Sequence, residues 1–351
     1  MKKILTTTAL VGSTLLASAT MSSAQVSITG QLDLSYKAQS TTNDPAKSYR
    51  GFGRESQINV GYKGKLNNGI GFNAGFSWEV DGNEAATSAA MNGMFAENTY
   101  LDFVMDKTTL SFSADHVQNP DFEITNIAGG KSDIDDVVYG IKGAEGKAYA
   151  ARNSNSAYQA FGFGLTQDFG VAKASVIYSP SRTSGLAGAD NTVSQTKADI
   201  EAGNSQLEFM IDGNFGVKGL RAFYYQGVSE SDAGSSAAND LKGRKIGASY
   251  NFGEFTVAAS QVDTESTANS NNNAKRKDIG LAYAASKDLT LGVIRTTTAT
   301  DGNPTETLKG INIGYNLGPV TLNTWYATAD DFNGVAGQEG KVLMFVTTTK
   351  F

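Results

Sequence analysis

The residues that could carry catalytic chemistry are few and poorly placed for it. His116 is the only histidine of the sequence, and its neighbour Asp115 would point to the opposite face of a strand, so the two form no local dyad. Nucleophilic catalysis needs a base held beside the nucleophile, and cysteine is absent from the chain. The run Gly130-Lys131-Ser132 lacks the first glycine of a phosphate-binding loop, because Thr125 occupies that position. We therefore expect no catalytic residue and no bound cofactor.

A long acidic segment is the second candidate for chemistry. It runs from about residue 117 to residue 157, and an irregular segment of that length is usually functional or disordered. The segment contains no twelve-residue calcium loop, so no metal site is predicted. Its carboxylates could instead create an electric field if other elements hold basic residues opposite them. The acids considered for this role are Asp121, Glu123, Asp133, Asp135 and Asp136.

Strands with a period of two residues are the elements that would position these charges. Between residues 26 and 37, apolar residues or glycine alternate with polar residues, ending with Tyr36 and Lys37. This pattern places one face of a strand in an apolar medium and the other in water. Strands of soluble sandwiches usually have about five or six residues. The length therefore favours a membrane-spanning strand, which needs roughly 9–11 residues.

Tight turns divide the rest of the chain into hairpins. The clearest turn is Asn68-Gly69, since both residue types tolerate a positive φ. Seven such turns, together with a first and a last strand, give sixteen strands, and eight longer polar segments lie between the hairpins, centred near residues 46, 89, 136, 189, 236, 270, 302 and 334. The sequence predicts an all-β fold: a single-domain transmembrane antiparallel barrel over residues 25–351, with short periplasmic turns and long extracellular loops.

Both ends of the chain fit an outer-membrane destination. Lys2 and Lys3 precede an apolar stretch, and small residues at 22–24 offer a cleavage site. We expect residues 1–24 to be a signal peptide, removed after Sec-type export through the periplasm. Phe351 ends a tail in which alternate residues from Leu343 share one face, as in the last strand of an outer-membrane barrel. It is expected to serve as the assembly signal for the outer-membrane barrel assembly machinery.

Composition excludes several other classes of protein. Without Lys2 and Lys3, 27 basic residues face 35 acidic residues, which gives a net charge of −8 and no dominant basic patch for nucleic acid. The absence of cysteine rules out disulfides in an exported protein. Beyond residues 1–24, no run of 18 apolar residues is present, so helical membrane spans are not expected. Only a closed barrel would cross a bilayer with this sequence.

Strand parity places a set of basic residues on the inner face of the predicted barrel. The third of the eight loops, about residues 117–157, is expected to fold into the lumen and bring its acids opposite these bases. Opposed charges create a transverse field that selects solutes by size, charge and dipole. For any single residue, ordinary solvation in a wet lumen is the alternative. The predicted basic wall comprises Lys37, Lys63, Lys173, Arg221 and Lys245.

Three segments carry a resemblance to a known family. They are Gln25–Asp33, the hairpin Ser56–Glu79 with its turn Lys63–Gly69, and the terminal Phe351. In these segments the chain resembles the general porins of Gram-negative proteobacteria, over essentially the whole mature length. The resemblance implies a sixteen-stranded, water-filled channel with an inward third loop, assembled as a homotrimer.

We therefore expect an outer-membrane pore for passive diffusion of small hydrophilic solutes and ions, surrounded by membrane lipid and lipopolysaccharide. The net charge of −8 and the acidic third loop predict a mild cation preference. A substrate-specific channel is one alternative, with a file of aromatic residues at Phe223, Tyr225 and Trp325. A non-conducting structural or adhesive barrel is the other. Residues considered for the aromatic girdles are Tyr36, Trp78, Tyr100 and Tyr326.

Overall fold

The described part of the chain is almost entirely β-strand. A computed structural model describes residues 25–42, 48–82, 95–114, 161–179, 205–230, 241–266 and 273–351. Within these ranges, no helix has the length and apolarity needed to cross a membrane. The predicted signal peptide (1–24) and third loop (about 117–157) lie outside the described residues. The elements are β1 (Gln25–Thr41), β2 (Tyr49–Lys65), β3 (Gly71–Gly82), β4 (Phe95–Met105), β5 (Thr108–Ala114), β6 (Phe161–Asp168), β7 (Ala172–Ser179), β8 (Ser205–Gly213), β9 (Leu220–Glu230), β10 (Leu241–Phe252), β11 (Phe255–Ser266), β12 (Ala274–Ala284), β13 (Leu289–Thr300), β14 (Glu306–Asn316), β15 (Val320–Asp330), the 3-10 helix η5 (Phe332–Gly334) and β16 (Gly340–Lys350).

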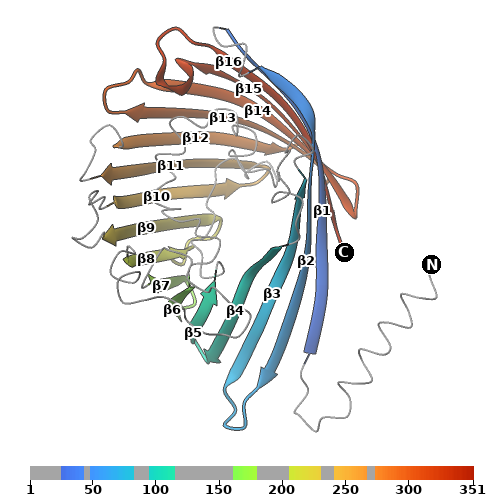
Figure 1. Cartoon of the computed structure of the whole chain (residues 1–351), viewed down its shortest axis with the longest axis vertical. Coiled ribbons are helices and arrows are strands. Elements are labelled where there is room, and N and C mark those ends of the chain that lie inside the picture. The colour runs from blue at the N-terminus through green and yellow to red at the C-terminus, as the bar shows by residue number, and fades with distance from the viewer. Residues whose placement is uncertain are drawn as a thin grey trace, which may run out of the picture.

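The strands form one closed antiparallel barrel. Each strand pairs with its neighbours in the sequence, and β1 pairs with β16 to complete the ring (Figure 1). In the closing pair, Gln31 lies opposite Lys350 and Thr41 lies opposite Gly340. The predicted all-β class, the sixteen strands and the pairing of the first strand with the last are confirmed.

The chain terminus belongs to the seam between β1 and β16. The Gly30 N–H donates to the Phe351 carbonyl at 2.7 Å, and the Phe351 N–H donates to the Gly30 carbonyl at 3.0 Å. The Phe351 ring covers Gly30 so closely that a Cβ at residue 30 would collide with it. The Phe351 ring therefore packs against β1 at a position where glycine leaves room for it. Its role as an assembly signal stays a prediction.

The short connections fall where the sequence predicts turns. Between β2 and β3, Gly69 has φ 86°, and its N–H donates to the Leu66 carbonyl at 2.9 Å. Between β4 and β5, Asp106 takes φ 50°, a conformation that aspartate tolerates better than most residues. These connections all lie at one end of the barrel, since every strand reverses direction at its turn. The longer connecting segments, including residues 115–160, join strands at the other end.

Exposure alternates along the strands and separates two faces. On β14, Ile311 is 51% exposed and Ile313 is 41% exposed. Leu308 and Asn312, which have the opposite parity on the same strand, are each 3% exposed. In a closed sheet, the exposed apolar side chains belong to the outer face and the alternate residues to the lumen. The outer face is thus suited to lipid.

Residues of an aromatic girdle must lie on the outer face of the barrel, and three of the four predicted residues do so. Tyr36, Trp78 and Tyr326 alternate with the lumen residues of their strands and lie on the outer face. The prediction is wrong for Tyr100, which lies on the inner face. Its ring occupies the space beside Gly75, where any side chain would collide with it. Parity within β4 gives the reason, because Leu101, not Tyr100, belongs to the outer face.

Candidate functional site

The inner face of the barrel is the candidate functional site. Parity places all five bases of the predicted basic wall on this face: Lys37, Lys63, Lys173, Arg221 and Lys245. The five predicted acids Asp121, Glu123, Asp133, Asp135 and Asp136 lie outside the described residues. Their roles as opposed rings therefore stay a prediction.

The five bases do not form a single wall. Lys63, Lys173 and Arg221 lie close to short turns, at the end of the barrel where those turns gather. Lys37 and Lys245 lie in the halves of their strands nearer the long connections, and β1 and β10 are on opposite sides of the ring. The five bases thus lie at two different heights along the barrel axis, and the two upper ones lie on opposite sides of the lumen.

Acidic neighbours accompany the bases at the turn end. The Arg221 guanidinium holds Asp212 with two nitrogens, Nη2 at 2.8 Å from Oδ2 and Nε at 3.1 Å from Oδ1. The Lys173 ammonium lies 3.9 Å from the Asp168 carboxylate. A bidentate arginine–carboxylate pair is the stronger of these two arrangements. The net field at this mouth is therefore weaker than the bases alone would produce.

Lys245 lies nearer the long connections and packs against an aromatic ring. Its Nζ lies 5.7 Å from the centroid of the Phe223 ring, within the range of a cation–π contact. The Phe223 ring in turn lies over Gly247, where a Cβ would collide with it. Lys245 is 7% exposed, so its charge acts in a less aqueous environment than the bases at the turn end.

A buried polar network on β12 is the part of the site that sequence reasoning missed. The Arg276 Nε donates to the Asp278 Oδ1 at 2.8 Å, and both side chains are 6% exposed. Asp278 also accepts from Ser260 Oγ at 2.9 Å and from Thr296 Oγ1 at 2.8 Å. The signal was available, because Ile279, an outer-face apolar residue, fixes the parity that turns residues 276 and 278 inward.

Arg276 and Lys245 belong to one row of the wall. Lys245 lies opposite Val262 on β11, and Val262 lies opposite Arg276 on β12. Two strand spacings separate the two Cα atoms, or roughly 10 Å. The inner face offers a concentrated pair of cations at this height, one of them neutralised by Asp278.

The inner-face residues whose side chains the structure describes form a set with nearly equal numbers of acids and bases. Its acids are Asp33, Asp102, Asp168, Glu208, Asp212, Asp278 and Glu306, and its bases are Lys37, Lys63, Lys65, Lys173, Arg221, Lys245, Arg276 and Lys350. Within the described residues, no three His, Cys, Asp or Glu side chains gather in a group suited to a metal ion. Charged side chains of both signs on this face create local electric fields, but their net charge is small.

An apolar patch interrupts the polar inner face on β13 to β16. Trp325 is 2% exposed, Val342 is 1% exposed and Met344 is 6% exposed, although all three project to the lumen side. Phe332 of η5 is fully buried and packs against Gly340, which covers part of this patch from the end with the long connections. The aromatic residues Phe223 and Tyr225 on β9 are also buried, at 3% each.

Comparison with known proteins identifies this kind of barrel. A sequence model described as Gram-negative porin matches residues 6–340. The anion-selective porin from Comamonas acidovorans shares the fold with 14% identity and a TM-score of 0.64, over 94% of this chain and 100% of that chain. A triple mutant of the Rhodopseudomonas blastica porin does so with 13% identity and a TM-score of 0.61, over 93% of this chain and 100% of that chain. No curated protein sequence matches. The chain belongs to the Gram-negative porin family, and as such it is an outer-membrane channel for passive diffusion.

Proposed function

We propose that this porin is a non-specific channel for small hydrophilic solutes and ions, with charge selection in the half of the lumen nearer the long connections. The row that holds Lys245 and Arg276 carries the proposal. Lys245 is 7% exposed and Arg276 is 5% exposed, so their fields are screened less than those of charges in bulk water. Lys37 contributes from the opposite side of the ring. The bases at the turn end act mainly at the periplasmic mouth.

We propose further that the third loop, about residues 117–157, folds into the lumen and faces this row with its acids. The buried apolar patch supports this, because apolar side chains on a wall that meets only water would be exposed. Trp325, Val342 and Met344 project to the lumen side and are at most 6% exposed, which an inward segment lying over them would account for. Asp121, Glu123, Asp133, Asp135 and Asp136 would then supply the acidic side of the constriction.

A mild cation preference follows from the same arrangement. The inner-face side chains that the structure describes are nearly balanced in charge, so additional acids in the lumen decide the sign of the field. This proposal concerns this chain alone, and the anion selectivity stated for the Comamonas acidovorans porin belongs to that protein.

The burial of the lumen aromatics favours the non-specific channel over the substrate-specific alternative. A file of rings that guides a solute must present its faces to the lumen. Phe223 and Tyr225 are 3% exposed and Trp325 is 2% exposed, so these rings offer little surface for stacking. The remaining expectations complete the proposal: a signal peptide at residues 1–24, a single barrel domain at residues 25–351, no catalysis, a homotrimer, contact with lipopolysaccharide, and Phe351 as the signal for the barrel assembly machinery.

The reversal potential of the channel in a salt gradient tests the proposed constriction. In a KCl gradient across a planar bilayer, the wild-type channel is expected to favour K⁺ over Cl⁻. Replacing Asp133, Asp135 and Asp136 together by asparagine should move the potential toward Cl⁻. The matched control is Glu254→Gln, in the short turn between β10 and β11, which should leave the potential unchanged. A wild-type anion preference, or an equal shift in the control, would contradict the proposal.

A further inference from the structure

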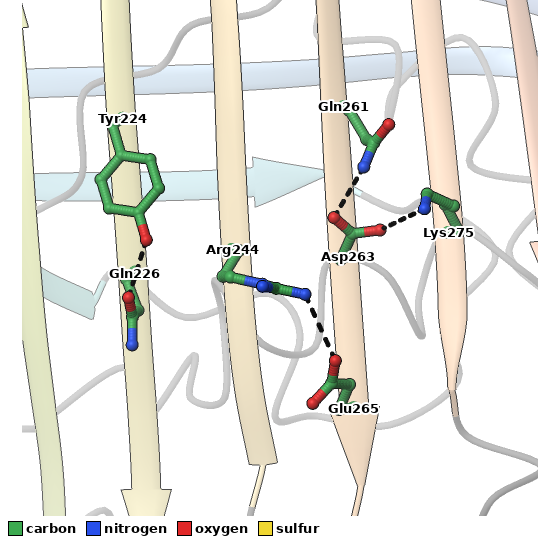
Figure 2. Close-up of polar contacts among 7 residues, drawn as sticks. All are labelled: Tyr224, Gln226, Arg244, Gln261, Asp263, Glu265 and Lys275. Carbon is green, nitrogen blue, oxygen red and sulfur yellow. Dashed lines mark hydrogen bonds and ion pairs between the residues drawn. The ribbon is translucent and has the colours of Figure 1, made fainter.

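A charged cluster lies on the outer face of the barrel, where a membrane protein normally presents apolar residues. It spans β10 to β13 in the halves of these strands nearer the long connections, and its members have the parity of the exposed residues Ile246 and Ile279. Figure 2 shows part of the cluster, in which Arg244 is directed toward Glu265 and Lys275 toward Asp263 across neighbouring strands. Charged groups avoid the hydrocarbon layer, so this height corresponds to the headgroup region.

The cluster is partly paired within itself. The Arg244 guanidinium lies 3.3 Å from the Glu265 carboxylate, and the Lys275 ammonium lies 3.4 Å from Asp263 (Figure 2). Gln261 Nε2 donates to the other oxygen of Asp263 at 2.8 Å. These contacts pair each of the two acids with one base of the cluster.

Two more bases complete the cluster. Lys277 and Arg295 are exposed, and neither has an acidic partner among the described residues. Lys277 lies opposite Thr297, two residues from Arg295 on the same face, so the two bases are diagonal neighbours. Like charges held side by side are unfavourable unless an anion lies between them. The cluster therefore has an excess of positive charge directed outward.

An apolar depression adjoins the bases on the side of the short turns. Ala222, Ala248 and Ala259 form one row across three strands, because Ala248 pairs with both of the others. Their small side chains leave an open depression of about 660 Å³, which Lys277 also lines. A second depression of about 290 Å³, lined by Arg244 and Lys275 among others, lies beside it, and both are lined by Tyr224, Ile246 and Gln261.

We propose that this surface binds a phosphate-bearing lipid of the outer leaflet, with its anionic headgroup on Lys277 and Arg295 and an acyl chain in the alanine depression. Basic groups at a membrane surface attract anionic headgroups. The alanine row crosses three strands, or roughly 10 Å, which accommodates part of an acyl chain. The same row continues through Ile279 on β12 to Arg295 on β13. The site depends on the outer-membrane location of the family. It is separate from the lumen, so the lipid-binding proposal and the proposed ion selection can each fail without affecting the other.

Lipid retention measured by native mass spectrometry tests the site. Delipidated porin would be titrated with dimyristoyl phosphatidic acid and, as the uncharged-headgroup comparison, with dimyristoyl phosphatidylcholine. The double variant Lys277→Gln with Arg295→Gln should weaken phosphatidic acid binding roughly 30-fold, from the usual contribution of a basic residue near an anionic surface. Ala248→Leu should also weaken it, because the added side chain fills the depression.

Matched controls keep the test specific. Lys341→Gln removes an exposed outer-face lysine on β16, and Ala74→Leu adds the same volume on β3, and neither should change binding. Equal retention of the two lipids, an equal effect of the controls, or protection by inorganic phosphate alone would overturn the proposal. A change in the number of subunits without any change in lipid retention would also overturn it, by assigning the surface to a second copy of the chain. Channel conductance should be the same in all variants.

Discussion

Replacing Lys245 by methionine should shift the ion selectivity of the channel toward cations. Methionine keeps an unbranched apolar side chain next to the Phe223 ring and removes the charge, which lies 5.7 Å from the ring centroid. Because Lys245 projects into the lumen from β10, its removal lowers the positive potential that passing ions meet. The barrel itself should form normally, since methionine keeps a side chain of similar length and shape at this buried position.

The size of the shift follows from Coulomb's law. With the screening of bulk water as the lower limit, a single charge acting on an ion about 6 Å away contributes roughly 0.7 kcal/mol, and a Debye length of about 10 Å at 0.1 M salt reduces this to about 0.4 kcal/mol. That energy changes the local concentration of each ion about twofold, in opposite directions for cation and anion. The permeability ratio of K⁺ to Cl⁻ should therefore rise about fourfold. In 1 M salt, where the Debye length is about 3 Å, the change should fall to about 1.4-fold.

The assay is the reversal potential of single channels in KCl gradients centred on 0.1 M and on 1 M. Lys242→Met is the matched control, because Lys242 lies on the same strand, is exposed and has outer-face parity. The control should leave the permeability ratio unchanged at both salt concentrations. An unchanged ratio in Lys245→Met, a shift toward anions, or an equal shift in the control would refute the reasoning. A fourfold shift that persists in 1 M salt would refute its electrostatic origin.

Three further predictions concern the seam, the periplasmic mouth and the apolar patch. Gly30→Leu should displace the C-terminal ring and destabilise the folded barrel by about 1–3 kcal/mol, as overpacking does. Gly51→Leu should not, because a Cβ at residue 51 meets no atom within 4 Å. The heat-induced loss of β-structure, measured by circular dichroism, compares the two variants. Asp212→Asn leaves the Arg221 charge without its carboxylate, so the reversal potential should move toward anions, and a move toward cations would contradict the pairing. Phe332→Ala should cost about 3–5 kcal/mol, the usual loss for a fully buried phenylalanine, and unchanged thermal unfolding would show that its packing is unimportant.

The architecture of the barrel was predictable from local sequence alone. Alternation in the first strand, the Asn68-Gly69 turn and the two-residue turn at Asp106 each depend on neighbouring residues, so each could be recognised without a structure. The pairing of β1 with β16 followed from an even strand count. The face of each basic residue also followed, because parity is a local property of a strand.

Height within the lumen could not be predicted in the same way. The stagger between strands decides which residues share a row, and parity carries no information about stagger. The predicted basic wall therefore combined Lys63 near a turn with Lys245 far from one. The same limit hid the network around Asp278, since parity turns Arg276 and Asp278 inward but does not show that Ser260 on β11 and Thr296 on β13 meet the carboxylate. The outer cluster around Lys277 needed the register of four strands, which no single segment contains.

Conductance of the purified protein in a planar bilayer tests the central claim most directly. A barrel of sixteen strands that encloses a water-filled channel should add current in discrete, uniform steps, with a conductance that rises with KCl concentration. The account predicts such steps for the wild type and for the outer-face variants alike. Insertion of folded protein without any stepwise conductance would contradict it, and would assign the barrel a structural role instead.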